Sequence, residues 1–185
     1  MLKKFVLGGM TALVLAACGG EGGSASSSAP AQSANASGSL IERINNKGTI
    51  TVGTEGTYAP FTYHDKDGKL TGYDVEVTRA VADKLGVKVE FKETQWDSMM
   101  AGLKAGRFDV VANQVGLTSP ERQATFDKSE PYSWSGAVLV ARKDSNIKSI
   151  DDIKGVKTAQ SLTSNYGEKA KAAGAELVPV DGLAQ

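Results

Sequence analysis

Gly72-Tyr73-Asp74-Val75-Glu76-Val77 is the stretch that decides the fold prediction. Together with the residues that follow, this stretch places Val77, Val81 and Leu85 on one face of a helix. Gly86 follows directly and can end that helix in the left-handed conformation. The stretch therefore predicts an amphipathic helix that begins after a glycine turn.

A β-hairpin is predicted immediately before this helix. The segments Phe61–His64 and Lys69–Gly72 flank Asp65-Lys66-Asp67-Gly68, whose composition is typical of a hairpin turn. Strands are also predicted at Thr49–Thr54, Val87–Glu93 and Asp109–Val115, and helices at Leu40–Asn46 and Trp96–Ala105, the latter with Met99, Met100 and Leu103 inward. Alternating strands and helices indicate an α/β fold with a parallel, doubly wound sheet.

The same alternation starts a second time further along the chain. Gly136–Arg142 is predicted to be a strand that crosses between two lobes. Ser149-Ile150-Asp151-Asp152 has the form of a capping box with aspartate in place of glutamate. The elements predicted next are a strand at Val156–Gln160, a helix at Ser164–Ala173 and a strand at Glu176–Val180. These are too few to close a core, so the second lobe is predicted to be truncated.

The chain begins with features of a secretory leader. Lys3 and Lys4 precede the apolar run Phe5–Leu15, which is too short to span a bilayer comfortably. Leu15-Ala16-Ala17-Cys18 resembles a bacterial lipobox, which implies cleavage before Cys18 and its acylation. The alternative is an ordinary signal peptide with a coincidental cysteine. Residues 19–39 are rich in small polar residues and are predicted to be a flexible linker.

The composition restricts the classes of partner and cofactor. Lys plus Arg and Asp plus Glu both number 21, and no basic run follows the leader, so nucleic acid and anionic lipid are poor candidates as partners. His64 is the only histidine, and Cys18 is the only cysteine. No clustered set of metal ligands is evident, so neither a metal nor another cofactor is expected.

Taken together, the leader, the hairpin and the Gly72–Val77 stretch resemble the family 3 extracellular solute-binding proteins, the polar amino-acid receptors of ABC importers. The resemblance implies a type II periplasmic-binding-protein fold with two doubly wound lobes joined by a hinge. It places lobe 1 at residues 40–136, and the hinge strand with the first part of lobe 2 at residues 137–185. It further implies a monomeric, membrane-anchored lipoprotein of the periplasm or cell envelope, with an inner-membrane ABC permease as its partner.

Arg122 is the candidate for binding a ligand carboxylate, which needs a planar bidentate donor. Ser119 and Pro120 are expected to start its helix as N-cap and first helical residue. The segment resembles the family's Thr-Pro-Glu-Arg, whose arginine binds the carboxylate. The preceding loop is one residue longer than usual, which shifts the family positions of Gly116 and Thr118 by up to one residue. The alternative is a solvated arginine paired with Glu121 or Asp127.

Other ligand roles follow from the resemblance. Glu55 matches an acidic family position and is the candidate for the ligand ammonium; the alternative is an exposed turn glutamate. Tyr58 and Trp96 match the two aromatic walls of the cleft, although a tryptophan is more often core. The family's second acidic residue belongs to a later part of lobe 2 that the sequence does not contain.

The turn between the first strand and helix of the second lobe offers the opposite wall. Its candidate residues are Gln160, Thr163, Ser164 and Asn165, because the free amides of a helix start attract anions. Leu162 replaces the usual glycine. The alternative is a plain N-cap at Thr163 or Ser164, and both roles can coexist. Gln114, with its neighbours Asn113 and Val115, most resembles the cystine-binding subgroup, which implies L-cystine or a related polar amino acid.

Two other classes of function remain open at this point. The first is an enzyme on the same scaffold, such as a dehydratase or lyase, because a fold alone does not determine function. Glu55 would be its candidate base, but no acid is evident to pair with it, so a binding protein is the favoured prediction. The second is a lipoprotein that senses amino acids at the surface without importing them.

Overall fold

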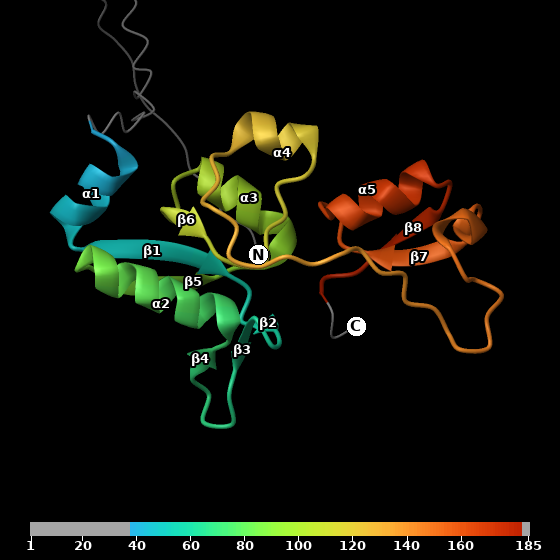
Figure 1. Cartoon of the computed structure of the whole chain (residues 1–185), viewed down its shortest axis with the longest axis horizontal. Helices are drawn as coiled ribbons and strands as arrows, with labels where there is room; N and C mark the ends of the chain where they lie inside the picture. The colour runs from blue at the N-terminus through green and yellow to red at the C-terminus, as the bar shows by residue number, and fades with distance from the viewer. Residues whose placement is uncertain (1–37, 183–185) are drawn as a thin grey trace, which may run out of the picture. The chain divides into compact units, whose positions relative to one another are not determined.

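Residues 38–182 are described by the structure, a computed structural model of the chain (Figure 1). The predicted leader, the lipobox with Cys18 and most of the linker lie outside the described residues. The helices and strands of the described part form one sheet with its covering helices, a small antiparallel sheet beside it, and a second, smaller α/β unit.

The first sheet is parallel, as predicted, with the order β5-β1-β6. Its central strand β1 (Thr49–Thr54) pairs with β5 (Lys88–Glu93) from Thr49 opposite Lys88 to Thr54 opposite Glu93. On the other side β1 pairs with β6 (Val110–Val111), with Val52 opposite Val110. Strand β1 is buried over nearly its whole length, as a central parallel strand should be. The predicted strand Asp109–Val115 is longer than β6, because its last residues turn away to hydrogen-bond other groups.

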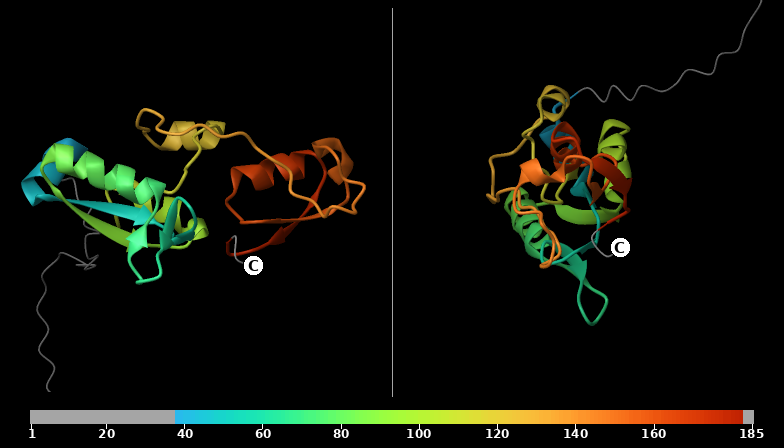
Figure 2. Two further views of the ribbon diagram at one scale, coloured as in Figure 1. Left: turned by 60° about the horizontal axis from the view of Figure 1, so that its bottom comes forward. Right: turned by 90° about the vertical axis from the view of Figure 1, so that its right-hand side faces the viewer.

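Helices α2 (Tyr73–Leu85) and α3 (Trp96–Lys104) connect these strands. The chain moves from β1 outward to β5 and then back across β1 to β6, so right-handed crossovers place the two helices on opposite faces of the sheet (Figure 1, Figure 2). Helix α1 (Leu40–Lys47) precedes β1, with a capping box formed by Ser39 and Glu42 at its start. Ile44 of α1 joins the core between the helices and the sheet.

The buried face of α2 differs from the prediction. Val75, Thr78 and Ala82 face the sheet, whereas Val81 is 48% exposed and Leu85 38% exposed. Both rows have helical spacing, so periodicity alone does not choose between them. The smaller side chains of Thr78 and Ala82 let the helix lie close to the sheet, and Ala82 joins its core. The predicted inward face of α3 is correct for Met99, which is fully buried, while Met100 and Leu103 are partly buried.

The predicted hairpin is confirmed as strands β3 (Thr62–His64) and β4 (Leu70–Thr71). A third strand that the sequence did not predict, β2 (Thr57–Tyr58), pairs antiparallel with β3. Asp65 closes the hairpin turn, since its carboxylate accepts hydrogen bonds from the backbone N–H groups of Asp67 and Lys69, both at 2.9 Å. Strand β2 places the loop after β1 against the hairpin, which matters for the site.

The second unit contains β7 (Lys157–Gln160), α5 (Asn165–Ala172) and β8 (Glu176–Pro179). The two strands are parallel, with Lys157 opposite Glu176. The predicted capping box is confirmed at the start of a 3₁₀ helix, η1 (Ile150–Ile153), where Ser149 and Asp152 bond each other's backbone. This strand-helix-strand unit matches the predicted order and nearly the predicted bounds.

The predicted crossover strand Gly136–Arg142 is wrong: no residue of that segment belongs to a strand. Its consecutive apolar side chains are largely in solvent, with Val138 84% exposed and Val140 89% exposed. A strand also needs neighbouring backbone groups for its hydrogen bonds, and none of the strands in residues 38–182 pairs with this segment. A run of apolar residues with a preference for strands does not specify which strand it would pair with.

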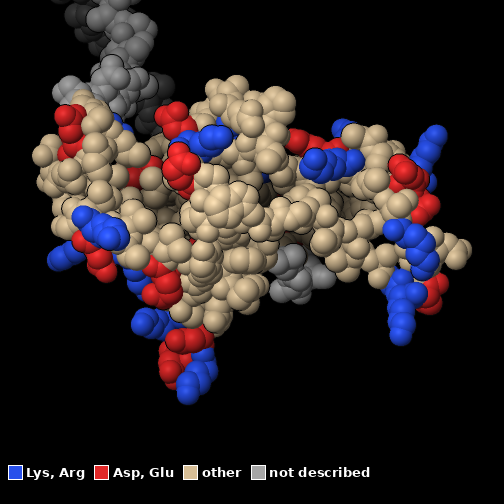
Figure 3. All heavy atoms as spheres, in the orientation of Figure 1, with Lys and Arg blue, Asp and Glu red and all other residues tan. Residues whose placement is uncertain are grey.

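On the face drawn in Figure 3, acidic and basic side chains are interspersed, for instance at the tip of the β3–β4 hairpin. No single-sign patch dominates this face, in keeping with the equal numbers of acidic and basic residues. Within residues 38–182, no helix has the length and apolar character needed to cross a membrane.

Close packing around Phe108 gives a first prediction. A methyl group on Gly53 would lie 2.7 Å from the Phe108 ring, and one on Gly102 would also lie 2.7 Å from it. Phe108 is only 4% exposed and has little room to move. We expect Gly53→Ala and Gly102→Ala each to lower the free energy of unfolding by about 1–3 kcal/mol, measured by urea denaturation.

Gly136→Ala is the control for this experiment, because nothing lies within 4 Å of the added methyl group. Adding Phe108→Leu to Gly53→Ala relieves the overlap, so the double variant should lose less stability than the two single losses combined. Equal stability of Gly53→Ala and Gly136→Ala would contradict the packing described around Phe108.

Candidate functional site

The candidate site lies at the carboxyl ends of the adjacent strands β1 and β6. Ligands of open α/β sheets bind in the crevice beyond these strand ends. Glu55 follows β1 directly, and Asn113 and Gln114 follow β6 by a few residues. Helix α3 begins at Trp96, just beyond the carboxyl end of β5. The topology thus brings the ends of three strands and the loops after them to one edge of the sheet.

Asn113 joins the loops after β1 and β6. It is 1% exposed, and its Oδ1 accepts hydrogen bonds from the backbone N–H of Glu55 at 2.8 Å and the hydroxyl of Thr54 at 3.2 Å. Its Nδ2 donates to the Glu55 carboxylate at 2.6 Å. Asn113 therefore fixes both the backbone and the side chain of Glu55. The sequence prediction did not assign it this role.

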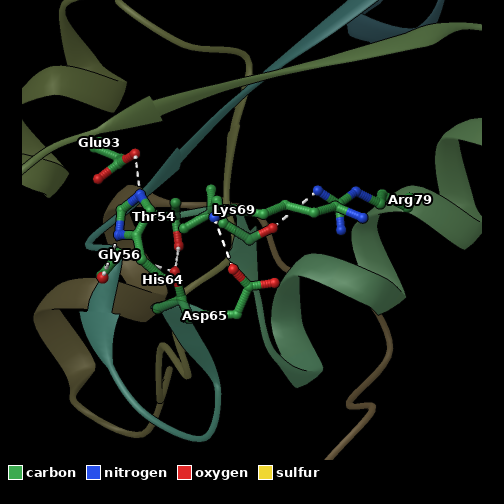
Figure 4. A network of polar contacts seen from close by, with 9 residues as sticks. Thr54, Gly56, His64, Asp65, Lys69, Arg79 and Glu93 are labelled. Carbon is green, nitrogen blue, oxygen red and sulfur yellow. Dashed lines mark hydrogen bonds and ion pairs between the residues drawn. The ribbon is translucent and has the colours of Figure 1, made fainter. Parts of the chain in front are cut away.

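The loop after β1 is also tied to the hairpin (Figure 4). The Thr62 hydroxyl, which is fully buried, accepts hydrogen bonds from the Gly56 N–H at 3.1 Å and the Thr54 hydroxyl at 2.8 Å. His64 lies between the Gly56 carbonyl, 3.2 Å from Nδ1, and the Glu93 carboxylate, 3.1 Å from Nε2. With Asn113 on the other side, these contacts hold the loop that carries Glu55 and Tyr58 in one conformation.

Tyr58 is half-buried and packs edge-on against Phe61, with 5.1 Å between ring centroids. Burial raises the pKa of its hydroxyl, and the nearby Tyr166, Glu55 and Asp74 raise it further. Tyr166 belongs to α5, so Tyr58 lies close to the second unit. The role of Tyr58 as a wall of the ligand cleft stays a prediction.

Arg122 is buried at the start of α4 (Pro120–Thr125). Ser119 caps this helix as predicted, accepting a hydrogen bond from the Arg122 N–H at 3.3 Å, and Pro120 is its first residue. The guanidinium donates to the Gly116 carbonyl at 3.0 Å and to the Thr163 carbonyl at 2.8 Å. It also lies 5.3 Å from the centre of the Trp96 ring, a cation–π distance.

All these partners of Arg122 are uncharged. The residue is 8% exposed, and among the described residues no ion pair includes it. The alternative of a solvated arginine paired with Glu121 or Asp127 is therefore wrong. Burying a cation without a counter-charge costs free energy. A carboxylate brought to this guanidinium would supply the missing charge.

Glu55 lacks an opposite charge as well. Its carboxylate accepts from the neutral Asn113 amide, and no ion pair among residues 38–182 involves it. At this edge of the sheet Arg122 is thus a cation and Glu55 an anion that are each held by neutral groups. An amino acid has the complementary pair of charges.

The turn between β7 and α5 is ordered by side-chain hydrogen bonds. The Ser164 hydroxyl caps α5, accepting from the N–H groups of Tyr166 at 3.2 Å and Gly167 at 3.3 Å, and it donates to Gln160 Oε1 at 3.1 Å. The expected plain N-cap is therefore present at Ser164. The N–H and hydroxyl of Thr163 both donate to the Asp97 carboxylate, at 2.9 Å and 2.8 Å.

Gln114 has a different environment from that of a free ligand-binding amide. Its backbone N–H and Nε2 donate to the two carboxylate oxygens of Asp74 at 2.7 Å and 2.6 Å, and its Oε1 accepts from Ser133 at 3.0 Å. Among the described residues it is the only one other than glycine with a positive φ, 50°. Asp74 therefore holds Gln114 in an unfavourable backbone conformation at the start of the Gly116–Arg122 loop.

Asp74 itself is completely buried, at the first turn of α2. Burial raises the pKa of its carboxyl group, while hydrogen bonds from Gln114 and Tyr132 act in the opposite direction. The pKa of Tyr132 is raised far above its usual range by burial and by the neighbouring Asp74. The sequence analysis used Asp74 only to identify the fold and did not predict its hydrogen bonds with Gln114. The signal that could have indicated such a role is a charged residue on the buried side of α2.

The structure thus brings most of the predicted residues together in two groups. Glu55 and Tyr58 lie at the end of β1, and the second group, at Arg122, consists of Trp96, Gly116, Arg122, Thr163 and Asn165. Gln114, Gln160 and Ser164 bond groups within their own units, and Thr118 is exposed. No group of three or more His, Cys, Asp or Glu that could hold a metal ion occurs in residues 38–182.

Comparison with known proteins assigns the family. The model of the bacterial extracellular solute-binding proteins, family 3, matches residues 50–177. The chain therefore belongs to this family, and the resemblance seen in its sequence is confirmed. Its fold is the α/β fold of type II periplasmic binding proteins, as its similarity to solved amino-acid-binding proteins shows.

Two curated relatives are each 61% identical to the chain. One, from Haemophilus influenzae, is named "Probable amino-acid ABC transporter-binding protein"; the match covers 80% of this chain and 58% of the relative. The other is the L-cystine-binding protein TcyA of Bacillus subtilis, matched over 80% of this chain and 55% of TcyA. The chain thus spans little more than half the length of these relatives. Both are named as binding proteins, not as enzymes.

The similar solved structures are also of amino-acid-binding proteins. The unliganded, open L-cystine solute receptor of Neisseria gonorrhoeae is 96% identical, with a TM-score of 0.52 over 80% of this chain and 62% of that one. The ancestral amino acid-binding protein AncCDT-1, described as a precursor of cyclohexadienyl dehydratase, is 37% identical, with a TM-score of 0.71 over 77% of this chain and 65% of that one.

Thr62 gives a prediction for the loop that holds Glu55. Thr62→Val keeps the shape of the side chain but leaves the Gly56 N–H without its acceptor and removes the nearer of the two acceptors of the Thr54 hydroxyl. We expect a loss of about 1–3 kcal/mol in the free energy of unfolding, measured by urea denaturation. Thr57→Val, at an exposed position of β2, is the control. Equal stabilities would show that the Thr62 hydroxyl does not anchor the loop.

Asp74 gives a prediction for pH dependence. Its pKa is higher in the folded chain than the ordinary 3.8, so above that pH the folded state binds more protons than the unfolded state. The stabilising effect of protonation is present below the ordinary value and is lost as pH rises. The free energy of unfolding of the wild type minus that of Asp74→Asn should therefore fall as the pH rises above the ordinary value of 3.8.

Asp109→Asn is the matched control with the opposite sign. Partial burial acts to raise the pKa of Asp109, but hydrogen bonds from Thr51 and the charge of Lys47 lower it overall. Its contribution to stability is lost as the pH falls, so the same difference should rise with pH. A wild-type minus Asp74→Asn difference that also rises would contradict the assignment for Asp74.

Proposed function

We propose that this chain is part of an extracellular receptor that binds a polar amino acid for an ABC importer. The observation that carries the proposal is the buried guanidinium of Arg122, which has only neutral partners in the described part of the chain. A ligand carboxylate would form charge-assisted, bidentate hydrogen bonds with it. Family membership supports the same function.

The other parts of an amino acid are assigned to neighbouring groups. Glu55, fixed by Asn113, would bind the ammonium group. Tyr58 and Trp96 would flank the ligand side chain and exclude water. Gly116, Thr118, Gln114 and the turn with Gln160, Thr163, Ser164 and Asn165 would complete the site, with Gln114, Gln160 and Ser164 acting through their hydrogen bonds to neighbouring residues.

L-cystine is the proposed ligand. Two proteins similar to this chain are named for it: TcyA of Bacillus subtilis and the solute receptor of Neisseria gonorrhoeae. Cystine carries two amino-acid ends, so one end would bind Arg122 and Glu55 while the disulfide and the second end extend between the aromatic side chains. Related polar amino acids are the alternatives to be compared in the same experiment.

The proposed mechanism is closure of two lobes about a hinge. Ligand would dock on residues 40–136, and residues 137 onward would close over it and present the closed form to a membrane permease. Ligand drives closure only if it binds the closed form more tightly than the open one. The receptor would act as a monomer, anchored through acylated Cys18 after removal of residues 1–17, with residues 19–39 as the linker in the periplasm or cell envelope.

Arg122→Gln tests the proposed role of the cation. The protein, expressed from Ser24 to its natural stop codon, would be titrated calorimetrically with L-cystine and with a panel of the standard amino acids. Hydrogen bonds to charged groups contribute about 1.5–3 kcal/mol each, so the loss of two should weaken binding by roughly a hundredfold or more.

Arg79→Gln is the matched control. Arg79 also lies over an aromatic ring, 5.6 Å from the centre of Phe91, and donates to a carbonyl group, that of Leu70. These contacts and its ion pair with Glu76 involve none of the predicted site residues. This variant should bind the same ligand with unchanged affinity. If the wild type bound no amino acid, or if Arg122→Gln bound as tightly as Arg79→Gln, the proposed function of this site would be wrong.

A further inference from the structure

Asp97 occupies the donors of the turn that is proposed to receive a ligand carboxylate. One of its carboxylate oxygens, Oδ1, accepts from the Thr163 N–H at 2.9 Å and from the Thr163 hydroxyl at 2.8 Å. The other, Oδ2, accepts from the Leu162 N–H at 3.2 Å. Asp97 was not among the residues assigned to the site from the sequence.

Thr163 therefore forms hydrogen bonds with two residues that precede the second unit, Asp97 and Arg122. Asp97 accepts from its N–H and hydroxyl, while Arg122 donates to its carbonyl. Asp97 follows Trp96, whose ring lies against the Arg122 guanidinium. The anion and the cation each bond Thr163 instead of bonding one another, although both belong to the same edge of the sheet.

Chemically, the Asp97 carboxylate stands in the place of a ligand carboxylate. An N–H group makes one strong hydrogen bond, so the Thr163 N–H cannot serve both Asp97 and a ligand. The same holds for the Thr163 hydroxyl hydrogen. A ligand that takes these donors must first remove Asp97, and two carboxylates on one turn would also repel each other.

We propose that Asp97 is an internal competitor for the ligand carboxylate, and that its displacement from Leu162 and Thr163 accompanies amino-acid binding. This inference rests on the proposed function of the same site. Asp97 would therefore lower the affinity for the ligand. A chain with a weaker acceptor at position 97 would bind the same amino acid more tightly, because fewer hydrogen bonds of the free protein are lost when the ligand binds.

Two measurements test the proposal on the protein expressed to its natural stop codon. The first is calorimetric titration of wild type, Asp97→Ala and Asp97→Asn with L-cystine. Asp97→Ala should bind at least about tenfold more tightly, because even one of the three charge-assisted hydrogen bonds that it removes from the competing state corresponds to that factor. Asp97→Asn should fall between the two, because its amide oxygen still accepts. Asp83→Asn, an exposed charge change on α2, should equal the wild type.

The second measurement needs no ligand, and it separates this inference from the proposed function. Amide hydrogen exchange by NMR reads the Leu162 and Thr163 N–H groups directly in protein without added amino acid. Both should be protected in the wild type and exchange about tenfold faster in Asp97→Ala, with α5 amides unchanged as the sign of an intact fold.

Each result decides a different point. Unchanged exchange in Asp97→Ala would show that the contact does not form, and equal or weaker L-cystine binding by Asp97→Ala would show that Asp97 does not compete. Either outcome overturns the inference. If no variant, the wild type included, bound L-cystine or any other amino acid of the panel, the proposed function would fall and with it the competition, while the exchange data would still report whether the contact exists.

Discussion

The buried guanidinium of Arg122 is the constraint on which the arrangement of this site depends. It is held by carbonyls from two separate loops and by the face of Trp96, with no carboxylate among its described partners. A cation in that setting is costly for folding alone. An anion-binding role would account for this unfavourable free energy. The burial that destabilises the guanidinium also strengthens its electrostatic interaction with a ligand carboxylate.

The sheet topology positions the loops that carry Glu55 and Gln114. Since β1 and β6 are adjacent and parallel, Asn113 after β6 reaches Glu55 after β1 and fixes it. Asp74 at the start of α2 holds Gln114 in its strained conformation, which directs the following loop toward Arg122. The buried polar residues of this region are satisfied by one another, so the loops are ordered before a ligand is considered.

Much of the fold could be predicted from the sequence because local signals and packing agree. Thr49–Thr54 is a strand with the predicted bounds, and Ser119 and Ser149 cap the helices they were expected to cap. The predicted strand at Gly136–Arg142 was wrong because a run of apolar, strand-favouring residues does not specify a partner strand. The face of α2 was wrong because two overlapping rows of residues both have helical spacing, and only contact with the sheet selects between them.

The site was predictable where one residue type suits one chemical group, as with Arg122, and less so where function depends on contacts between distant residues. The residues next to Asn113 and Asp97 in the sequence do not indicate that each hydrogen-bonds a loop roughly sixty positions away. Gln114 shows the converse, since a polar residue at the right place proved to be bonded to Asp74 and Ser133. Long-range hydrogen bonds assign such roles, and a single sequence does not contain them explicitly.

A crystal structure of the protein grown with L-cystine tests the central claim most directly. The account predicts a ligand carboxylate in bidentate contact with Arg122, the adjacent ammonium on Glu55, and the Asp97 carboxylate withdrawn from Thr163. A structure in which the ligand carboxylate lies elsewhere, while Arg122 remains on the carbonyls of Gly116 and Thr163, would contradict it.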